Sequence, residues 1–367
     1  MARLPAEGAP SVSAFGGWAA AHAVASGTGE ADGATAAPCS DAASDRWYFA
    51  AGSSALGADE RLVVSNPFLD EAVVRIVFFT PRGPKAKAGL ADVAVPAGRS
   101  VAVAINDYIL RQPVLGAEVA TRRGRVVAWR EQRSRDRVSG AVLALGARRP
   151  AATWYFPDGA LGDAYDERIA LLNPSGREAL ITVTLASSDR VVQPPELVEL
   201  SLPPGTARQL ALGSAVPPPR RGVAVGAVVR SVNGVEVVAE RTVAYEGQGL
   251  AAEVGATSKG RAWHLGPAAR RPDRDAVVVL NPGTRDARVR VLLLRAGAPP
   301  LAPRALSGVE VRAGLCVRLP VARWTHGAPM GAAVTSDTAI VAERSSYSRE
   351  GSDPAASMGT PLAPVRR

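Results

Sequence analysis

The feature that most constrains this chain is a set of short motifs that occurs three times, at intervals of about 107 residues. Each copy opens with a triplet that begins with Trp, continues into an apolar run that ends in Asn-Pro, and closes with a Val-Ala-x-Arg run. The openings are Trp47-Tyr48-Phe49, Trp154-Tyr155-Phe156 and Trp263-His264-Leu265. The Asn-Pro pairs begin at Asn66, Asn173 and Asn281, and the closing runs end at Arg130, Arg241 and Arg344. A fixed period of this kind indicates repeated structural units.

Each copy has the pattern of an antiparallel β-sandwich. Its apolar runs are short and β-branched, and Gly, Pro, Asn or Asp bounds them. Residues 179–185 alternate, so that Ile181 and Val183 point to the same face of a strand. The dipeptide Asn233-Gly234 favours a tight hairpin between the last two strands of the second copy. We therefore predict an all-β fold of three tandem Ig-like antiparallel β-sandwich repeats.

The predicted boundaries follow from the motifs and from the composition between them. We expect a disordered leader at 1–44, repeats at 45–148, 152–256 and 261–350, and a flexible tail at 351–367. The leader is rich in Ala, Gly, Ser and Thr and shows no periodicity, which favours disorder, although part of it could be the remnant of an export signal or anchor. Because the linkers between repeats are short, we expect the repeats to pack against one another.

Twelve recurrent side chains are predicted to be structural. Each repeat has a Trp at its opening, an Asn at a strand end, an acidic residue six positions before that Asn, and a closing Arg. These residues are Trp47, Trp154, Trp263, Asn66, Asn173, Asn281, Glu60, Glu167, Asp275, Arg130, Arg241 and Arg344. We expect the Trp to fill the core, the Asn to end a strand, and the acid and the Arg to bridge the sandwich. The Arg could also stack on the Trp of its own repeat, and the Trp residues could instead form carbohydrate platforms.

The charge of this chain does not by itself indicate nucleic-acid binding. Its formal net charge is +9, but only Lys85, Lys87 and Lys259 are lysines among the 43 basic residues. The arginines are scattered and often adjoin Asp or Glu, which is typical of a solvated, ion-paired surface. We expect no nucleic-acid partner; a cell-wall polymer or another envelope protein remains open.

Few residues suggest catalysis or metal binding. The chain has two cysteines, Cys39 and Cys316, and three dispersed histidines, so we predict no metal site and no cofactor. The cysteines could be bridged or free. We find no Gly-x-Ser-x-Gly motif and no glycine-rich phosphate loop in a strand–helix context. The sequence therefore favours a protein that is not an enzyme.

The three motifs together give the chain a resemblance to a known family. With its Trp-Tyr-Phe openings, Asn-Pro strand ends and Val-Ala-Glu-Arg closings, the region 39–350 resembles an uncharacterised family of actinobacterial envelope proteins, a domain of unknown function usually preceded by an export signal or a membrane anchor. The resemblance implies an extracytoplasmic location, secreted or anchored, while a cytoplasmic one stays open because this chain shows no clear anchor segment. It transfers no catalytic or binding residue.

Three functions remain to be compared. The first is a non-enzymatic cell-envelope protein, structural or adhesive, that presents its faces and loops. The alternative is a carbohydrate- or anionic-wall-polymer-binding protein, which requires exposed aromatic side chains or a contiguous strip of arginines. A second alternative is an enzyme with a site at a domain junction, which requires a cleft lined by carboxylates or His with shifted pKa values.

Overall fold

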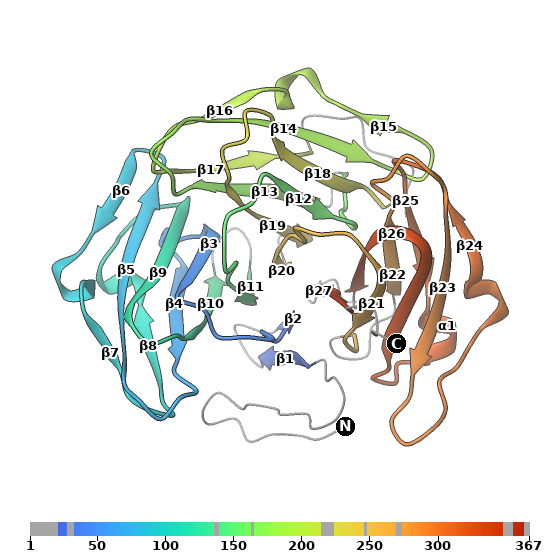
Figure 1. Ribbon diagram of the computed structural model, residues 1–367, viewed down its shortest axis with the longest axis horizontal. Coiled ribbons are helices and arrows are strands. Elements are labelled where there is room, and N and C mark those ends of the chain that lie inside the picture. The colour runs from blue at the N-terminus through green and yellow to red at the C-terminus, as the bar shows by residue number, and fades with distance from the viewer. Residues whose placement is uncertain are drawn as a thin grey trace.

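The computed structural model describes residues 21–27, 33–135, 139–162, 165–213, 224–245, 248–268, 274–347 and 355–362. Three sets of strands surround a common centre, and strands β11, β20 and β27 are the innermost members of their sets (Figure 1). We name the sets unit 1, unit 2 and unit 3 in chain order. Strands dominate the described residues, so the predicted all-β class is confirmed.

The bounds of the elements are as follows. Unit 1 contains β3 (Arg46–Gly52), β4 (Ala58–Ser65), β5 (Ala72–Thr80), β6 (Gly83–Ala86), η1 (Ala88–Leu90), β7 (Val93–Val95), β8 (Ser100–Ala104), η2 (Ile105–Asp107), β9 (Leu115–Arg123), β10 (Val127–Arg135) and β11 (Ser139–Leu145). Unit 2 contains β12 (Thr153–Phe156), β13 (Tyr165–Asn173), β14 (Ala179–Ala186), β15 (Val191–Val192), η3 (Pro195–Leu197), β16 (Leu200–Leu202), β17 (Thr206–Ala211), β18 (Gly226–Ser231), β19 (Val238–Tyr245) and β20 (Gln248–Val254). Unit 3 contains β21 (Gly260–Leu265), β22 (Arg274–Leu280), β23 (Ala287–Leu294), η4 (Arg304–Leu306), β24 (Ser307–Val311), β25 (Cys316–Pro320), α1 (Ala322–Thr325), β26 (Gly331–Tyr347), β27 (Ala355–Met358) and β28 (Thr360–Pro361).

The same strand order recurs in the two sheets of each unit. In unit 1 the first sheet is β3-β9-β5-β6, with β7 also on β5, and the second sheet contains β8-β4-β10-β11. In unit 2 the first sheet is β12-β18-β14-β15, with β16 also on β14, and the second contains β17-β13-β19-β20. In unit 3 the 17-residue β26 serves both sheets, since it pairs first with β21 and β23 and later with β22 and β27.

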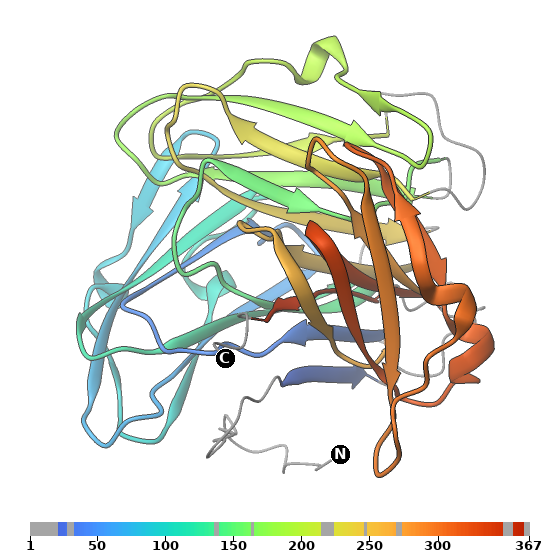
Figure 2. The ribbon, with the colours of Figure 1, turned by 45° about the vertical axis from the view of Figure 1, so that its right-hand side comes forward.

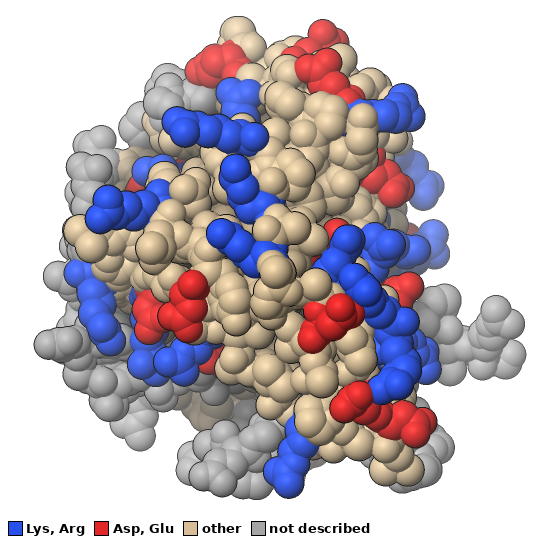
Figure 3. Space-filling model, turned by 90° about the vertical axis from the view of Figure 1, so that its left-hand side faces the viewer, with Lys and Arg blue, Asp and Glu red and all other residues tan. Residues whose placement is uncertain are grey.

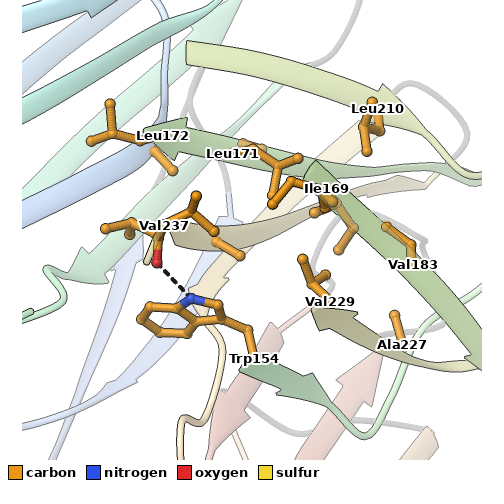
Figure 4. Packing of buried hydrophobic residues seen from close by; sticks show 14 of the residues in the cluster. Trp154, Ile169, Leu171, Leu172, Val183, Leu210, Ala227, Val229 and Val237 are labelled. Carbon is orange, nitrogen blue, oxygen red and sulfur yellow. Dashed lines mark hydrogen bonds between the residues drawn. The ribbon is translucent and has the colours of Figure 1, made fainter. Parts of the chain in front are cut away.

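The core of each unit lies between its two sheets and is organised around one tryptophan. Trp47, Trp154 and Trp263 each belong to a separate cluster of buried apolar side chains. Figure 4 shows Trp154 packed among side chains of both sheets, including Ile169 and Val229. Alternation along the strands supplies this core, because every second side chain of a strand faces the opposite sheet.

The units pack in a head-to-tail arrangement. The first sheet of unit 1 lies against the second sheet of unit 2, where Tyr48 and Phe79 join the cluster built around Trp154. The next junction repeats this packing, since Tyr155 of unit 2 packs against a buried cluster that contains Val278 and Leu280 of unit 3. The second sheets of units 1 and 2 also form one continuous eight-stranded sheet, through a short parallel contact between β11 and β20.

The prediction of disorder in the leader (1–44) and of flexibility in the tail (351–367) is wrong for those residues of the two segments that the structure describes. Within 1–44, strands β1 (His22–Gly27) and β2 (Gly33–Pro38) form an antiparallel pair, and β2 contacts β11, β20 and β27 at the centre. Figure 2 shows β1 and β2 between the blue-green strands of unit 1 and the orange strands of unit 3. Within 351–367, β27 and β28 pair with β26 and β21. Small side chains such as Ala36 and Ala37, both buried, allow strands to approach closely at this centre. Residues 1–20, 28–32, 348–354 and 363–367 lie outside the described residues.

Candidate functional site

The three recurrent tryptophans are core residues. Trp47 and Trp263 are 0% exposed and Trp154 is 2% exposed, so these side chains cannot act as carbohydrate platforms. Each indole N–H donates to a backbone carbonyl inside its unit: that of Val126, Val237 or Ile340, respectively. Figure 4 shows this bond for Trp154. The cation–π pairs in the described part of the chain are Arg125 with Phe68 and Arg323 with Trp324, so the predicted stacking of a recurrent Arg on a recurrent Trp is not among them.

The three recurrent asparagines form the same hydrogen bonds in every unit. Each side chain is at most 1% exposed. Its Nδ2 donates to the carbonyl four residues later and to a carbonyl at the end of another strand, while its Oδ1 accepts from the amide two residues later. The acceptors are Asp70 and Val95 for Asn66, Arg177 and Leu202 for Asn173, and Arg285 and Val311 for Asn281. These bonds satisfy backbone groups where the chain leaves a strand, which is a structural role.

The junction between units 1 and 2 contains a buried ion pair. Nη2 of Arg130 in β10 donates to Oε2 of Glu240 in β19 at 2.9 Å, and both side chains are 0% exposed. The other oxygen of Glu240 accepts from the backbone N–H of Ala50 in β3 at 2.6 Å. Nη1 of Arg130 donates to Gln132 at 2.5 Å. One carboxylate of unit 2 therefore binds two elements of unit 1.

The junction between units 2 and 3 repeats this link and adds a second carboxylate. Nη2 of Arg241 in β19 donates to Oε1 of Glu343 in β26 and to Oε1 of Glu253 in β20, each at 2.5 Å. Oε2 of Glu343 accepts from the backbone N–H of Asp158 at 3.0 Å. Asp158 in turn pairs with Arg318 of β25 in unit 3. The Glu of each Val-Ala-Glu-Arg run therefore binds the Arg of the preceding unit.

The recurrent Glu of units 1 and 2 lies beside these links and accepts from a backbone amide instead of the guanidinium. Oε2 of Glu60 accepts from the N–H of Ser53 at 2.5 Å, and Oε2 of Glu167 from that of Ala160 at 2.6 Å. A Cβ at Gly159 would lie 2.5 Å from Oε1 of Glu167 and 2.3 Å from a backbone oxygen, so only glycine fits there. The predicted direct bridge from the recurrent acid to the recurrent Arg is therefore not formed in units 1 and 2.

Unit 3 does contain the direct bridge. Nε and Nη2 of Arg344 donate to the two oxygens of Asp275 at 2.9 and 2.7 Å, and Nη1 donates to the carbonyl of Gly266 at 2.9 Å. In the part of the chain that the structure describes, no glutamate of another unit bonds to this Arg. His22 of β1 lies against Gly266 instead, and its imidazole is 3.4 Å from that of His264. The sequence places these two histidines far apart, and the fold brings them together.

The position that corresponds to Glu240 and Glu343 is Trp129 in unit 1. Trp129 is partly buried on the second sheet, across from Val63, and its indole N–H donates to Glu131 at 3.0 Å. Among the described residues, no closing Arg of another unit bonds to this position, and the Trp129 side chain lies partly buried on its own sheet.

Burial determines the acid–base properties of these groups. It raises the pKa of Glu60 to about 7 and that of Glu167 to about 8, against the opposing effects of Arg130 and Arg241. Burial also raises the pKa of Glu253 and of Glu343, and the proximity of the two carboxyl groups raises that of Glu343 further. Two carboxyls beside one guanidinium therefore favour retention of a proton between them. The side chains of both Arg–Glu links are at most 5% exposed, so a substrate cannot reach them in this conformation.

The remaining candidate groups are isolated. Cys39 and Cys316 are free thiols, and Sγ of Cys316 donates to the carbonyl of Ala186 at 3.0 Å. Within the described ranges, no group of three or more His, Cys, Asp or Glu side chains could hold a metal ion. Among those same residues, no helix has the length and apolar character needed to cross a bilayer.

Sequence reasoning missed the roles of Glu240, Glu253, Glu343 and Asp158. A signal for two of them was present, because Val-Ala-Glu-Arg places two charged residues side by side in an otherwise apolar strand. Such a pair is costly to bury unless both charges find partners. The motif itself therefore indicated that both charges have partners, but not which residues these partners are.

The comparison with protein families agrees with the internal repetition. A family model described as a family of unknown function, DUF5719, matches residues 6–262 and, in a second overlapping match, residues 141–363. A single model that fits one chain twice in displaced positions is expected for a repeated sequence. No curated protein matches this sequence significantly. The two matches together cover nearly the whole chain, and the protein therefore belongs to the DUF5719 family.

Proposed function

We propose that this protein is a non-enzymatic scaffold of the cell envelope, structural or adhesive, made of three tandem Ig-like β-sandwich units held as one rigid body. The observation that carries the proposal is that the side chains recurring once per unit are buried and bonded inside the protein. Repetition therefore maintains shape, and the exposed loops remain free to differ between units.

The unit junctions support the rigid body. Each is an apolar contact that also contains a buried Arg–Glu link, and an Arg–Glu pair that is fully desolvated fixes the orientation of the groups it joins. Scaffolds and adhesive proteins require this property, because they hold surfaces at fixed separations. The burial of the junction carboxylates argues against the enzyme alternative, which needs them in an open cleft.

Fractionation of the native host with mass-spectrometric mapping of the N-terminus tests the location. The proposal expects the protein in the envelope or secreted fraction. Recovery of a chain that still begins with Met1 in the cytosolic fraction would contradict the envelope assignment.

Binding to an anionic wall polymer is the second candidate, and the formal net charge of +9 favours it. Figure 3 shows the side of the molecule on which unit 1 lies, where basic side chains are distributed with acidic ones among them. Sedimentation with purified cell wall, before and after chemical removal of its anionic polymer, separates the two functions. Co-sedimentation that disappears with the polymer, and with added salt, favours the second candidate.

A further inference from the structure

One loop of unit 1 exposes two large apolar side chains that its fold does not require. Leu69 is 96% exposed and Phe68 is 39% exposed, in the loop that follows Asn66 between β4 and β5. Exposed apolar side chains that lie together and are rimmed by polar residues mark interaction sites, whereas apolar side chains exposed singly are normal.

The corresponding loops of units 2 and 3 provide an internal control. They contain Ser175-Gly176 and Gly283-Thr284 in place of Phe68-Leu69. In all three loops the asparagine Oδ1 accepts from the amide two residues later and Nδ2 donates to the carbonyl four residues later. The same turn is therefore built with small polar residues twice, so the apolar pair of unit 1 has a role other than forming the turn.

Arginines surround this apolar tip. The turn at residues 96–99 bonds to the loop through the N–H of Gly98 and the carbonyl of Phe68 at 3.0 Å, and it carries the exposed Arg99. The guanidinium of Arg125 lies 5.3 Å from the centre of the Phe68 ring. The corresponding turns of unit 2, at 203–206 and 232–235, contain no arginine.

Some of the local charge is already neutralised. Arg122 and Arg123 pair with Asp92 and Glu71 at 3.2 and 2.6 Å. Arg99 and Arg125 form no ion pair with any carboxylate that the structure describes, and Asp70 is the remaining exposed acid of the loop. Two arginines therefore remain available beside two exposed apolar side chains.

We propose that this end of unit 1, which we call the Phe68–Leu69 tip, docks onto a phospholipid surface that contains anionic lipid. Leu69 and Phe68 would enter the boundary between headgroups and acyl chains, while Arg99 and Arg125 bind lipid phosphates. A guanidinium forms paired hydrogen bonds with a phosphate, and its position over the Phe68 ring holds it at the headgroup level. The inference goes beyond the scaffold function and does not depend on where the protein resides in the cell.

Sedimentation of the full chain with vesicles tests the proposal. The vesicles are pure phosphatidylcholine, or phosphatidylcholine mixed with phosphatidylglycerol. The test variant, Phe68→Ser with Leu69→Gly, introduces the loop sequence of unit 2 and leaves the turn bonds in place. We expect the wild type to bind the mixed vesicles and this variant to bind at least about tenfold more weakly, because two large apolar side chains are lost from the interface.

Matched controls distinguish insertion from general stickiness. Leu110→Ser removes another exposed leucine of unit 1, which is 66% exposed. Leu110 precedes Arg111, whose N–H bonds to the carbonyl of Ser54 ahead of strand β4, whereas the Phe68–Leu69 tip follows the other end of that strand. This variant should bind vesicles like the wild type. Arg99→Ser with Arg125→Ser should lose the preference for phosphatidylglycerol, whereas Arg75→Ser, on β5, should keep it. Equal binding by the loop variant and the wild type would overturn the proposal, as would no binding by the wild type. The proposal would also be overturned if the wild type bound another protein through this tip and did not bind vesicles, since the tip would then be a protein contact.

Discussion

The closing arginines at the two unit junctions and the closing arginine of unit 3 bind different kinds of partner. At the junctions, Arg130 and Arg241 donate to a glutamate of the following unit, and the recurrent acid of their own unit accepts from a backbone amide. In unit 3, Arg344 bonds to no glutamate of another described unit and binds its own Asp275 through two hydrogen bonds. The difference shows that one repeated strand can either join two units or close one, depending on which carboxylate reaches the guanidinium.

The largest expected effect is at the first junction. Glu240→Ala leaves Arg130 buried without its carboxylate and leaves the N–H of Ala50 unpaired, so we expect a loss of about 3 to 5 kcal/mol in the free energy of unfolding. Urea denaturation measures the loss. A second variant, Glu240→Leu, replaces the carboxylate by an apolar side chain of similar volume. A loss below about 1 kcal/mol in the free energy of unfolding of both variants would show that the Arg130–Glu240 pair does not join the units.

The closing arginine of unit 3 should have nearly as large an effect on stability, confined to that unit. Arg344→Ala leaves Asp275 as an unpaired buried charge, with an expected loss of about 3 kcal/mol. The double variant Arg344→Met with Asp275→Leu removes both charges and should recover most of that stability. Hydrogen exchange should place the loss in unit 3; equal loss of protection in unit 1 would break the distinction between end and junction.

The second junction is expected to tolerate the matching change better than the first. Glu343→Ala leaves Arg241 bonded to Glu253 and removes the repulsion between two buried carboxyls. We expect a loss of about 1 to 2 kcal/mol, in the same denaturation assay, from the unpaired amide of Asp158 and the cavity. A loss larger than that of Glu240→Ala would show that Glu253 does not compensate.

The pH dependence of stability sharpens the comparison further. The pKa values of Glu60 and Glu167 are raised to about 7 and about 8, so the folded state holds protons that the unfolded chain releases above about pH 4.5. The free energy of unfolding should therefore fall as pH rises from about 4.5 to about 8. Glu167→Gln keeps an acceptor for the amide of Ala160 and should flatten the fall, most clearly above pH 7. An unchanged slope would mean that Glu167 does not titrate in this window.

The smallest effect is expected at Trp129, the position where unit 1 lacks the joining glutamate. Trp129→Glu restores the motif, but the side chain at this position is partly exposed and lies near Glu131, and the closing arginine of unit 3 is already bonded to Asp275. We expect the free energy of unfolding to fall by about 1 kcal/mol or less, because the Trp129 side chain that is replaced is only partly buried. A gain in stability would mean that a glutamate at this position finds an arginine partner, as Glu240 and Glu343 do.

The sequence predicts the interior of each unit better than the contacts between units. The strand class and the positions of Trp154 and Asn173 follow from local patterns, since alternation and an Asn-Pro strand end depend on neighbouring residues. The bond from Glu343 to Arg241 cannot be predicted in this way, because its partners are 102 residues apart and meet only through the packing of whole sheets. The order in β2 was also missed, because Ala- and Gly-rich composition is typical both of disorder and of closely packed strands.

A double-mutant cycle between Arg130 and Glu240 tests the central claim most directly. The cycle compares Arg130→Met, Glu240→Leu and the combined variant by urea denaturation, so that the effect of each single change is subtracted. A link that joins units 1 and 2 predicts a coupling of about 2 kcal/mol or more between these positions. A coupling below about 0.5 kcal/mol would contradict it, since the two side chains would then contribute independently.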